Sequence, residues 1–266
     1  MARLRLDRAV ARCFDLTRSQ AAAAIREGRV SLAGQVCRVP ALQIEPGAGL
    51  MLDGRACSAA EGLRRRVFML NKPAGVVCAD RDRCAVTVME LFASEPRPWL
   101  LHPAGRLDAD VRGLLLITDD GALIHRLTAP RHGIARVYEV TTAAPIPAAA
   151  AEDFARGLHH PQERRPYRSA VLEVLAPCRA RVCVREGRYH EVKRLFECVG
   201  TQVSALRRVQ LGALRLDERL QAGEYRRLGE EELEAVFEGA AAMTPPASSA
   251  ASAAAGVMSD STTRST

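Results

Sequence analysis

Gly105-Arg106-Leu107-Asp108 is followed, after a short gap, by the apolar segment Leu114-Leu115-Leu116-Ile117. The first segment predicts a tight loop that carries one carboxylate and one guanidinium, and the second predicts a buried strand. A carboxylate held beside a guanidinium at the end of a buried strand stays ionised and can attack carbon. Asp108 is therefore the first candidate for a catalytic residue, although an aspartate that only caps a turn would have the same local sequence.

The composition favours a globular protein with a polyanionic partner. The chain has 266 residues, of which 48% are hydrophobic and only 4% aromatic, so aliphatic side chains must fill the core. Its formal net charge is +7, and Lys72 and Lys193 are the only lysines among 38 basic residues. Arginine makes planar, bidentate contacts with phosphate. A genomic bias toward arginine would leave the same excess, so charge alone does not decide the partner.

Cysteines and apolar segments limit the cellular setting. The eight cysteines are dispersed, with no Cys-x-x-Cys pair, which predicts ordinary thiols in a reducing cytoplasm and no metal site. The N-terminus is charged and lacks the apolar core of a signal peptide. No apolar run approaches the length needed to cross a bilayer. We expect a cytoplasmic protein without membrane contact.

Residues 1–60 are predicted to form a small basic domain. A helix capped by Thr17 or Ser19 is expected to reach Arg26 and to end at Gly28, and a hairpin over residues 29–36 is expected to turn at 33–34. Up to residue 66 there are twelve basic and six acidic residues, so this segment holds +6 of the formal +7. Charge concentrated in this way predicts phosphate binding.

A linker at residues 61–66 is expected to lead into a second domain at 67–239. Strands outnumber helices in this part, which predicts an α+β domain built on a mixed, largely antiparallel sheet. Residues 240–266 are rich in Ala, Ser, Thr and Pro, and we expect them to form a disordered tail. The expected strands are 67–70, 114–118, 137–142, 170–175, 181–185 and 203–211, and the expected helices are 122–127, 148–157, 189–199 and 230–237.

A second polar cluster lies in the segment that begins with Glu186-Gly187-Arg188-Tyr189-His190. Apolar residues at positions 192, 195, 196 and 199 predict a helix with one buried side. His190, Lys193 and Arg194 lie together away from that side. An ordinary amphipathic helix with a solvated basic face would show the same pattern.

Three extended motifs resemble the pseudouridine synthases that act on ribosomal RNA. They are residues 102–108 with 113–115 and 118–121, residues 186–196, and the Arg136-Val137-Tyr138 segment at the start of a strand. The N-terminal segment resembles the S-four type RNA-binding module at residues 5–7, Ser19, Ile25, 28–30 and Gly34. The resemblance covers residues 3 to about 237. It implies the matching two-domain fold and the isomerisation of uridine within RNA, with no cofactor and no metal.

The resemblance also implies roles for individual residues. Asp108 would be the nucleophile, Lys193 would keep its carboxylate ionised, and Tyr138 would stack on the target base. An apolar residue, Leu195, would contact the uracil. The remaining implied RNA contacts are Arg106, His190 and Arg194 near the site, and Arg5, Arg18 and Arg29 in the N-terminal module.

Three positions depart from the family pattern without removing a catalytic group. Val111 stands where a threonine is usual, Arg136 replaces a lysine, and Glu191 replaces a glutamine. Glu191 brings a negative charge near the site, which could lower activity or alter the choice of target.

The expected partner is 16S rRNA or a pre-ribosomal small-subunit particle, with the protein acting as a monomer. A 23S rRNA synthase of the same family stays open as an alternative, and so does a non-catalytic RNA-binding protein for ribosome assembly. A nucleotide hydrolase or kinase is disfavoured because no Gly-x4-Gly-Lys-Ser/Thr loop is present. Dispersed cysteines and histidines disfavour a metalloenzyme.

Overall fold

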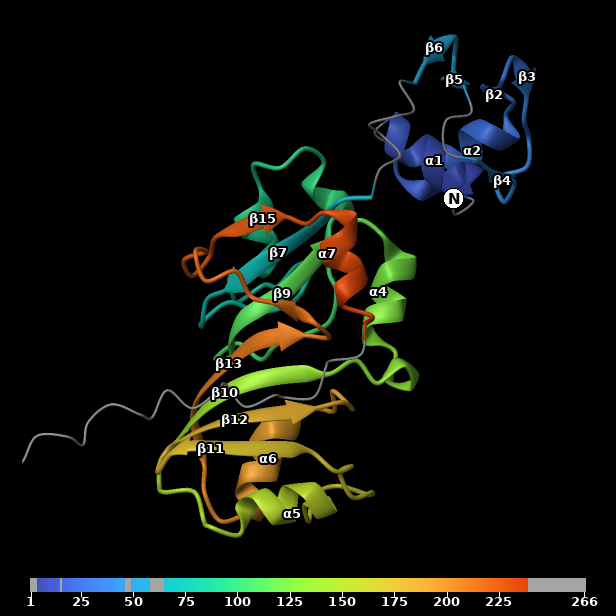
Figure 1. Ribbon diagram of the computed structural model, residues 1–266. Helices are drawn as coiled ribbons and strands as arrows, with labels where there is room; N and C mark the ends of the chain where they lie inside the picture. Colours follow the sequence, from blue (N-terminus) through green and yellow to red (C-terminus); the bar gives the residue numbers. More distant parts are fainter. Residues whose placement is uncertain (1–3, 15, 46–48, 58–64, 239–266) are drawn as a thin grey trace, which may run out of the picture.

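The computed structural model describes residues 4–14, 16–45, 49–57 and 65–238, which form a small N-terminal unit and a larger second unit (Figure 1). The expected tail at 240–266 and most of the expected linker at 61–66 lie outside the described residues. No helix of the described part is long and apolar enough to cross a membrane.

The N-terminal unit packs two short helices against small strands. Thr17 caps α2 (Arg18–Arg26) in a reciprocal arrangement with Gln20, as the sequence predicts. The strands β2 (Val30–Leu32) and β3 (Gln35–Val36) form the expected hairpin, whose turn residues Ala33 and Gly34 both have positive φ. The remaining elements are β1 (Leu4–Arg5), α1 (Leu6–Cys13), β4 (Gln43–Ile44), β5 (Leu50–Leu52) and β6 (Arg55–Ala56).

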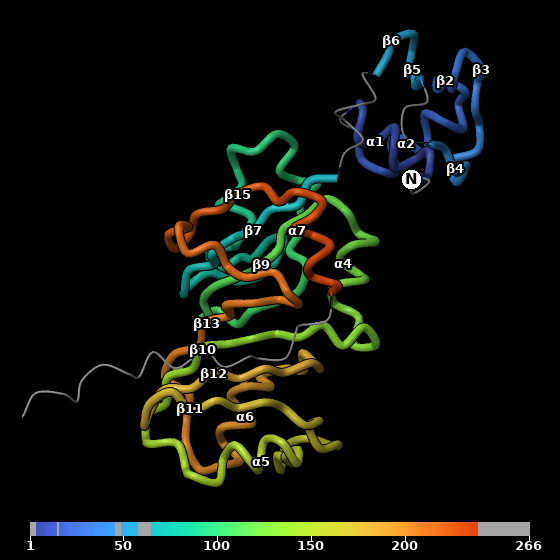
Figure 2. The backbone as a smooth tube through the Cα atoms, in the orientation of Figure 1, coloured from blue at the N-terminus to red at the C-terminus, as the bar shows by residue number. Residues whose placement is uncertain are grey.

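A nine-stranded sheet dominates the second unit, with the main order β11-β12-β10-β13-β9-β7-β15. Among the strand pairs described for this sheet, only that of β9 with β13 is parallel, so the predicted mixed, largely antiparallel α+β fold is confirmed. Figure 2 shows β15, close to the end of the described chain, beside β7, the first strand of the second unit. The strands are β7 (Val67–Lys72), β8 (His102–Pro103), β9 (Arg112–Thr118), β10 (Arg136–Thr142), β11 (Val171–Ala176), β12 (Arg179–Val184), β13 (Val203–Leu211), β14 (Leu214–Arg215) and β15 (Tyr225–Arg227).

Helices cover both faces of the sheet, which explains the long apolar runs in its central strands. In β7, Phe68 and Leu70 point into one core with α5 and α6, whereas Val67 and Met69 point into the other with α4 and α7. The sequence of a strand that is buried on both faces is a continuous apolar segment, whereas a strand with one exposed face alternates apolar and polar residues. The helices are α4 (Gly121–Thr128), α5 (Ala150–Arg156), α6 (Glu191–Cys198) and α7 (Glu230–Ala235), with 3-10 turns η1 (Val88–Phe92), η2 (Pro98–Leu100) and η3 (Pro130–His132).

Gly113 allows the parallel pairing of β9 with β13 to form. It has φ 103° and pairs with Arg208 of β13. A Cβ at this position would lie 2.2 Å from the Arg208 carbonyl oxygen, so no side chain fits. The glycine thereby brings the beginning of β9, and the loop before it, close to the strands at the centre of the sheet.

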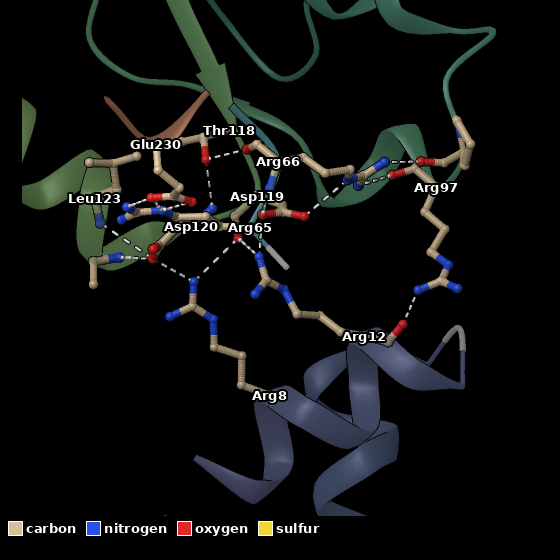
Figure 3. A network of polar contacts seen from close by, with 12 residues as sticks. Arg8, Arg12, Arg65, Arg66, Arg97, Thr118, Asp119, Asp120, Leu123 and Glu230 are labelled. Carbon is tan, nitrogen blue, oxygen red and sulfur yellow. Dashed lines mark hydrogen bonds and ion pairs between the residues drawn. The ribbon is translucent and has the colours of Figure 1, made fainter. Parts of the chain in front are cut away.

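An arginine–carboxylate network joins the two units (Figure 3). Asp119, directly after β9, forms ion pairs with Arg12 of α1 and with Arg66. Asp120, which caps α4, pairs with Arg8 of α1 at 2.6 Å. The side chains of Arg12 and Asp119 are 7% and 5% exposed, so this contact is buried rather than a surface pair. The network fixes α1 against the end of β9.

Candidate active site

The loop before β9 holds Asp108 at the mouth of a cavity. The Asp108 side chain is 31% exposed, and its backbone carbonyl accepts from the Val111 amide at 3.1 Å. Beneath the loop lies Lys72, the last residue of β7, which is 0% exposed. Its ammonium donates to four backbone carbonyls, those of Pro73, Asp108, Ala109 and Val111, at 2.9–3.2 Å.

Two side chains from the α6 region meet the Asp108 carboxylate. Lys193 Nζ and His190 Nε2 each lie 3.3 Å from Asp108 Oδ2. Lys193 also donates to Asp110 Oδ1 at 2.9 Å. Burial lowers the pKa of Lys193, but the hydrogen bond to Asp110 and the charges of both carboxylates outweigh this effect and raise it. The lysine therefore stays a cation between two carboxylates.

His190 owes its position to an unusual backbone conformation. It precedes α6 with φ 53°, a left-handed conformation that a residue with a side chain seldom adopts. The sequence predicts a helix that begins two residues earlier, at Tyr189, whereas α6 begins at Glu191. This left-handed residue ends the preceding loop and turns the imidazole toward Asp108.

The cavity has a volume of about 290 Å³ and lies between Asp108 and the centre of the sheet. Such a volume is near the lower end of the range for small-ligand sites, roughly 300–1,000 Å³. Tyr138 of β10 lines it and is 8% exposed, with Val182 and Arg208 as its neighbours on the adjacent strands. Further lining residues are Arg106, Leu107, Val111, Arg136, Val192 and Leu206.

Arg106 and Leu195 lie differently from what the motif alone suggests. Arg106 is exposed and lines the cavity, but the described side-chain contacts of the Asp108 carboxylate go to His190 and Lys193 rather than to this arginine. Leu195 is 1% exposed and belongs to the core beneath α6. The apolar residue of α6 that lines the cavity is Val192, one turn before it. Helical periodicity explains this exchange, because both residues share the buried side.

Arg194 is held by a carboxylate that sequence reasoning missed. Glu163, in the loop after α5, forms ion pairs with both Arg188 and Arg194 and accepts from the Tyr167 hydroxyl at 3.1 Å. Despite some burial, these partners lower the pKa of Glu163. Glu163 thus ties the loop to α6. Its sequence context, a stretch of Arg and Pro, carries no motif that could have predicted this role.

The three departures from the family pattern all line the cavity. Glu191 is 6% exposed, and its Oε2 accepts from the backbone amides of Gly187 and Arg188 at 2.6 and 3.1 Å. Burial raises the pKa of Glu191 more than these two donors lower it. Arg136 is fixed by the backbone carbonyls of Ile134 and Leu127. Glu191 therefore supports the loop before α6 instead of pointing freely into the site.

The basic residues of the N-terminal unit are exposed but anchored. The side chains of Arg5 and Arg18 are 42% and 64% exposed, and both contact Asp7. Arg29 is 50% exposed and pairs with Asp53 at 2.6 Å. These residues lie away from the Asp108 cavity, since none of them lines it.

Family models match both units of the chain. Residues 66–197 match the RNA pseudouridylate synthase family, and residues 4–50 match the S4 domain. The chain is 42% identical to ribosomal small subunit pseudouridine synthase A of Escherichia coli K12 over 233 residues, which cover 88% of this chain and 100% of that protein. The chain belongs to the RNA pseudouridylate synthase family.

Further relatives carry the same kind of name. The protein of the same name from Haemophilus influenzae is 38% identical over 235 residues, covering 88% of this chain and all of that one. Among solved structures, one described as a pseudouridylate synthase superposes with a TM-score of 0.62 at 39% identity. It covers 88% of this chain and 99% of its own.

Proposed function

We propose that this protein isomerises a uridine of 16S rRNA to pseudouridine. The reaction breaks the bond between N1 of uracil and C1′ of ribose and forms a bond from C5 to C1′. The proton lost from C5 is balanced by one gained at N1, so neither a cofactor nor an energy source is needed. The names of relatives that match along their full length support the small-subunit substrate.

One observation carries the catalytic assignment. The Asp108 carboxylate lies at the opening of a nucleoside-sized cavity, 3.3 Å from the Lys193 ammonium. In the proposed mechanism Asp108 assists departure of the uracil, and Lys193 balances the carboxylate charge. Preorganised charge in a site that excludes water is the main means of stabilising such a reaction.

Tyr138 is assigned to hold the uracil after it leaves the sugar. Its ring lines the cavity from the centre of the sheet, where strands on both sides fix it. The detached base must rotate without escaping, and an aromatic face retains a planar ring while allowing it to turn. Arg106 and His190 are assigned to the rim, and Arg5, Arg18 and Arg29 to phosphates further along the RNA.

Replacement of Asp108 by asparagine tests the proposal. Pseudouridine should be absent from 16S rRNA in cells that contain only the Asp108→Asn variant, and the purified variant should still bind the RNA. Asp153→Asn is the control, because it makes the same change at a carboxylate of α5 that does not line the cavity and should leave pseudouridine formation unchanged. Pseudouridine formed by Asp108→Asn would overturn the catalytic assignment. A loss confined to 23S rRNA would instead identify the large-subunit alternative.

The proposal includes a monomer that acts in the cytoplasm. Ribosome assembly in that compartment supplies either naked rRNA or a partly assembled particle. Mass measurement of the purified protein in solution tests the monomer, and comparison of the two substrates in turnover assays identifies the preferred form of the RNA.

A further inference from the structure

Tyr189 presents an aromatic ring to solvent beside the candidate active site. It is 65% exposed, and in the described chain only Trp99, at 58%, is another aromatic residue among the exposed large apolar side chains. Tyr189 does not line the cavity itself, whereas its neighbours Arg188 and His190 do. The ring therefore lies just outside the cavity, at its rim.

His190 lies between the Tyr189 ring and the Asp108 carboxylate and contacts both. The rings of Tyr189 and His190 are 3.7 Å apart between centroids and 19° from parallel. The His190 Nε2 lies 3.3 Å from Asp108 Oδ2, and the left-handed backbone at His190 sets the direction of its ring. A planar ligand on Tyr189 would thus lie next to the reacting nucleotide.

The surroundings of Tyr189 are already ordered. Arg188 and Arg194 are both held by Glu163, and the Arg194 guanidinium carbon lies 5.5 Å from the Tyr189 ring centroid. A tyrosine side chain has few torsions, so little conformational entropy is lost when a ligand stacks on it. Two guanidiniums that share one carboxylate leave net positive charge beside the ring, which favours a phosphate there.

We infer that Tyr189 is a stacking site for the nucleobase adjacent to the target uridine. This inference rests on the proposed function. While the target base occupies the cavity, the next base of the strand has lost a stacking neighbour and lies outside the rim. An exposed aromatic ring replaces that neighbour and accepts any base, because every base has a π face.

The expected effects separate binding from catalysis. Alanine in place of a stacking ring weakens nucleic-acid binding by roughly 5- to 150-fold. Tyr189→Ala should raise KM by about fivefold or more and leave kcat nearly unchanged, and Tyr189→Phe should behave as the original protein. Trp99→Ala is the control, since it removes an equally exposed aromatic ring in η2, which does not line the cavity.

A change in the RNA substrate provides a second test of the stacking site. An RNA oligonucleotide that carries the mapped target uridine is prepared intact and with an abasic residue at its 5′ or 3′ neighbour. Binding is measured by fluorescence anisotropy. The abasic residue at one of these positions should weaken binding to the original protein by about the same factor as Tyr189→Ala. In the Tyr189→Ala variant the same abasic residue should not weaken RNA binding any further.

Two results would overturn the stacking site. One is a lower kcat with unchanged KM in Tyr189→Ala, which would mean that the ring only supports His190. The other is an abasic residue that weakens RNA binding by Tyr189→Ala as much as it weakens binding by the original protein. Turnover of the intact oligonucleotide by the original protein tests the proposed function separately. If no pseudouridine forms, that function fails, while the anisotropy comparison still decides whether the base stacks on Tyr189.

Discussion

The ammonium of Lys72 donates to the backbone carbonyl of Asp108 at 3.2 Å. Its side chain is fully buried at the end of β7, and burial lowers the pKa of Lys72. A buried cation is costly unless polar groups surround it, and here backbone carbonyls take the place of a carboxylate partner. The lysine thereby fixes the backbone of the loop that presents Asp108, while Lys193 acts on the carboxylate itself.

Lys72→Met should damage both the fold and the reaction. The carbonyls of the loop would lose the charged donor that they share, which costs about 1–3 kcal/mol in the free energy of unfolding. A displacement of Asp108 by about 1 Å would lower kcat by roughly 100-fold. Thermal unfolding and single-turnover kinetics measure the two effects. Lys193→Met is the matched control and should lose activity with little change in Tm. Unchanged kcat in Lys72→Met would contradict the positioning role.

Asp110→Asn should move the alkaline limb of the pH–rate profile to lower pH. Asp110 and Asp108 both raise the pKa of Lys193, so removal of one carboxylate brings that pKa down. Lys193 would then lose its proton, and its charge beside Asp108, at a lower pH than in the original protein. Single-turnover rates between neutral and strongly alkaline pH measure the shift. An alkaline limb that stays in place would show that another group limits the reaction there.

Glu191→Gln should stabilise the protein in a pH-dependent manner. Because the folded state raises the pKa of Glu191 above its ordinary 4.5, it holds the proton to a higher pH than the unfolded chain does. Stability therefore falls as pH rises through that interval. A glutamine oxygen can accept the same two backbone amides without a charge. The Tm of Glu191→Gln should match the original protein below the ordinary pKa and exceed it at neutral pH.

Glu218→Gln provides the control for this comparison. Glu218 is exposed, so the same change in charge should leave Tm nearly constant across the pH range. A constant Tm difference between Glu191→Gln and the original protein at every pH would contradict the assignment to a buried carboxyl.

Asp119→Ala should release the N-terminal unit from the second unit. The substitution leaves Arg12 without its ion-pair partner in a buried contact, and the loss of one member of such a pair costs about 3–5 kcal/mol. Limited proteolysis of the segment between the units should become faster, and Tm should fall. Asp153→Ala breaks an i,i+3 pair with Arg156 on α5 and should change neither measurement appreciably.

The strands were predictable because their apolar patterns are long and local. The strand at 203–211 has the predicted bounds, and the strand at 112–118 begins two residues earlier than expected. The helix α1 (Leu6–Cys13) was missed, although Leu6, Ala9 and Val10 have helical spacing and are buried. Asp7 and Arg8, which separate Leu6 from the two other residues, concealed that pattern.

The site was predictable only where a motif carried it. The pairing of Asp108 with Lys193 joins two recognised segments, and the structure brings them within 3.3 Å. By contrast, the contacts of Lys72 and Glu163 depend on tertiary packing between distant segments. No periodicity within the sequence encodes which carbonyls surround an ammonium or which arginines share a carboxylate.

The strand β9 separates the loop of Asp108 from the contact between Asp119 and the N-terminal unit. Asp108 lies four residues before its first residue and Asp119 directly after its last, and the seven residues of the strand span about 23 Å. A single nucleotide that fills the cavity is too short to touch α1 as well. In the proposed function, β9 therefore sets the separation between the uridine in the cavity and the phosphates bound by the N-terminal unit, and it favours an RNA whose folded shape matches this separation.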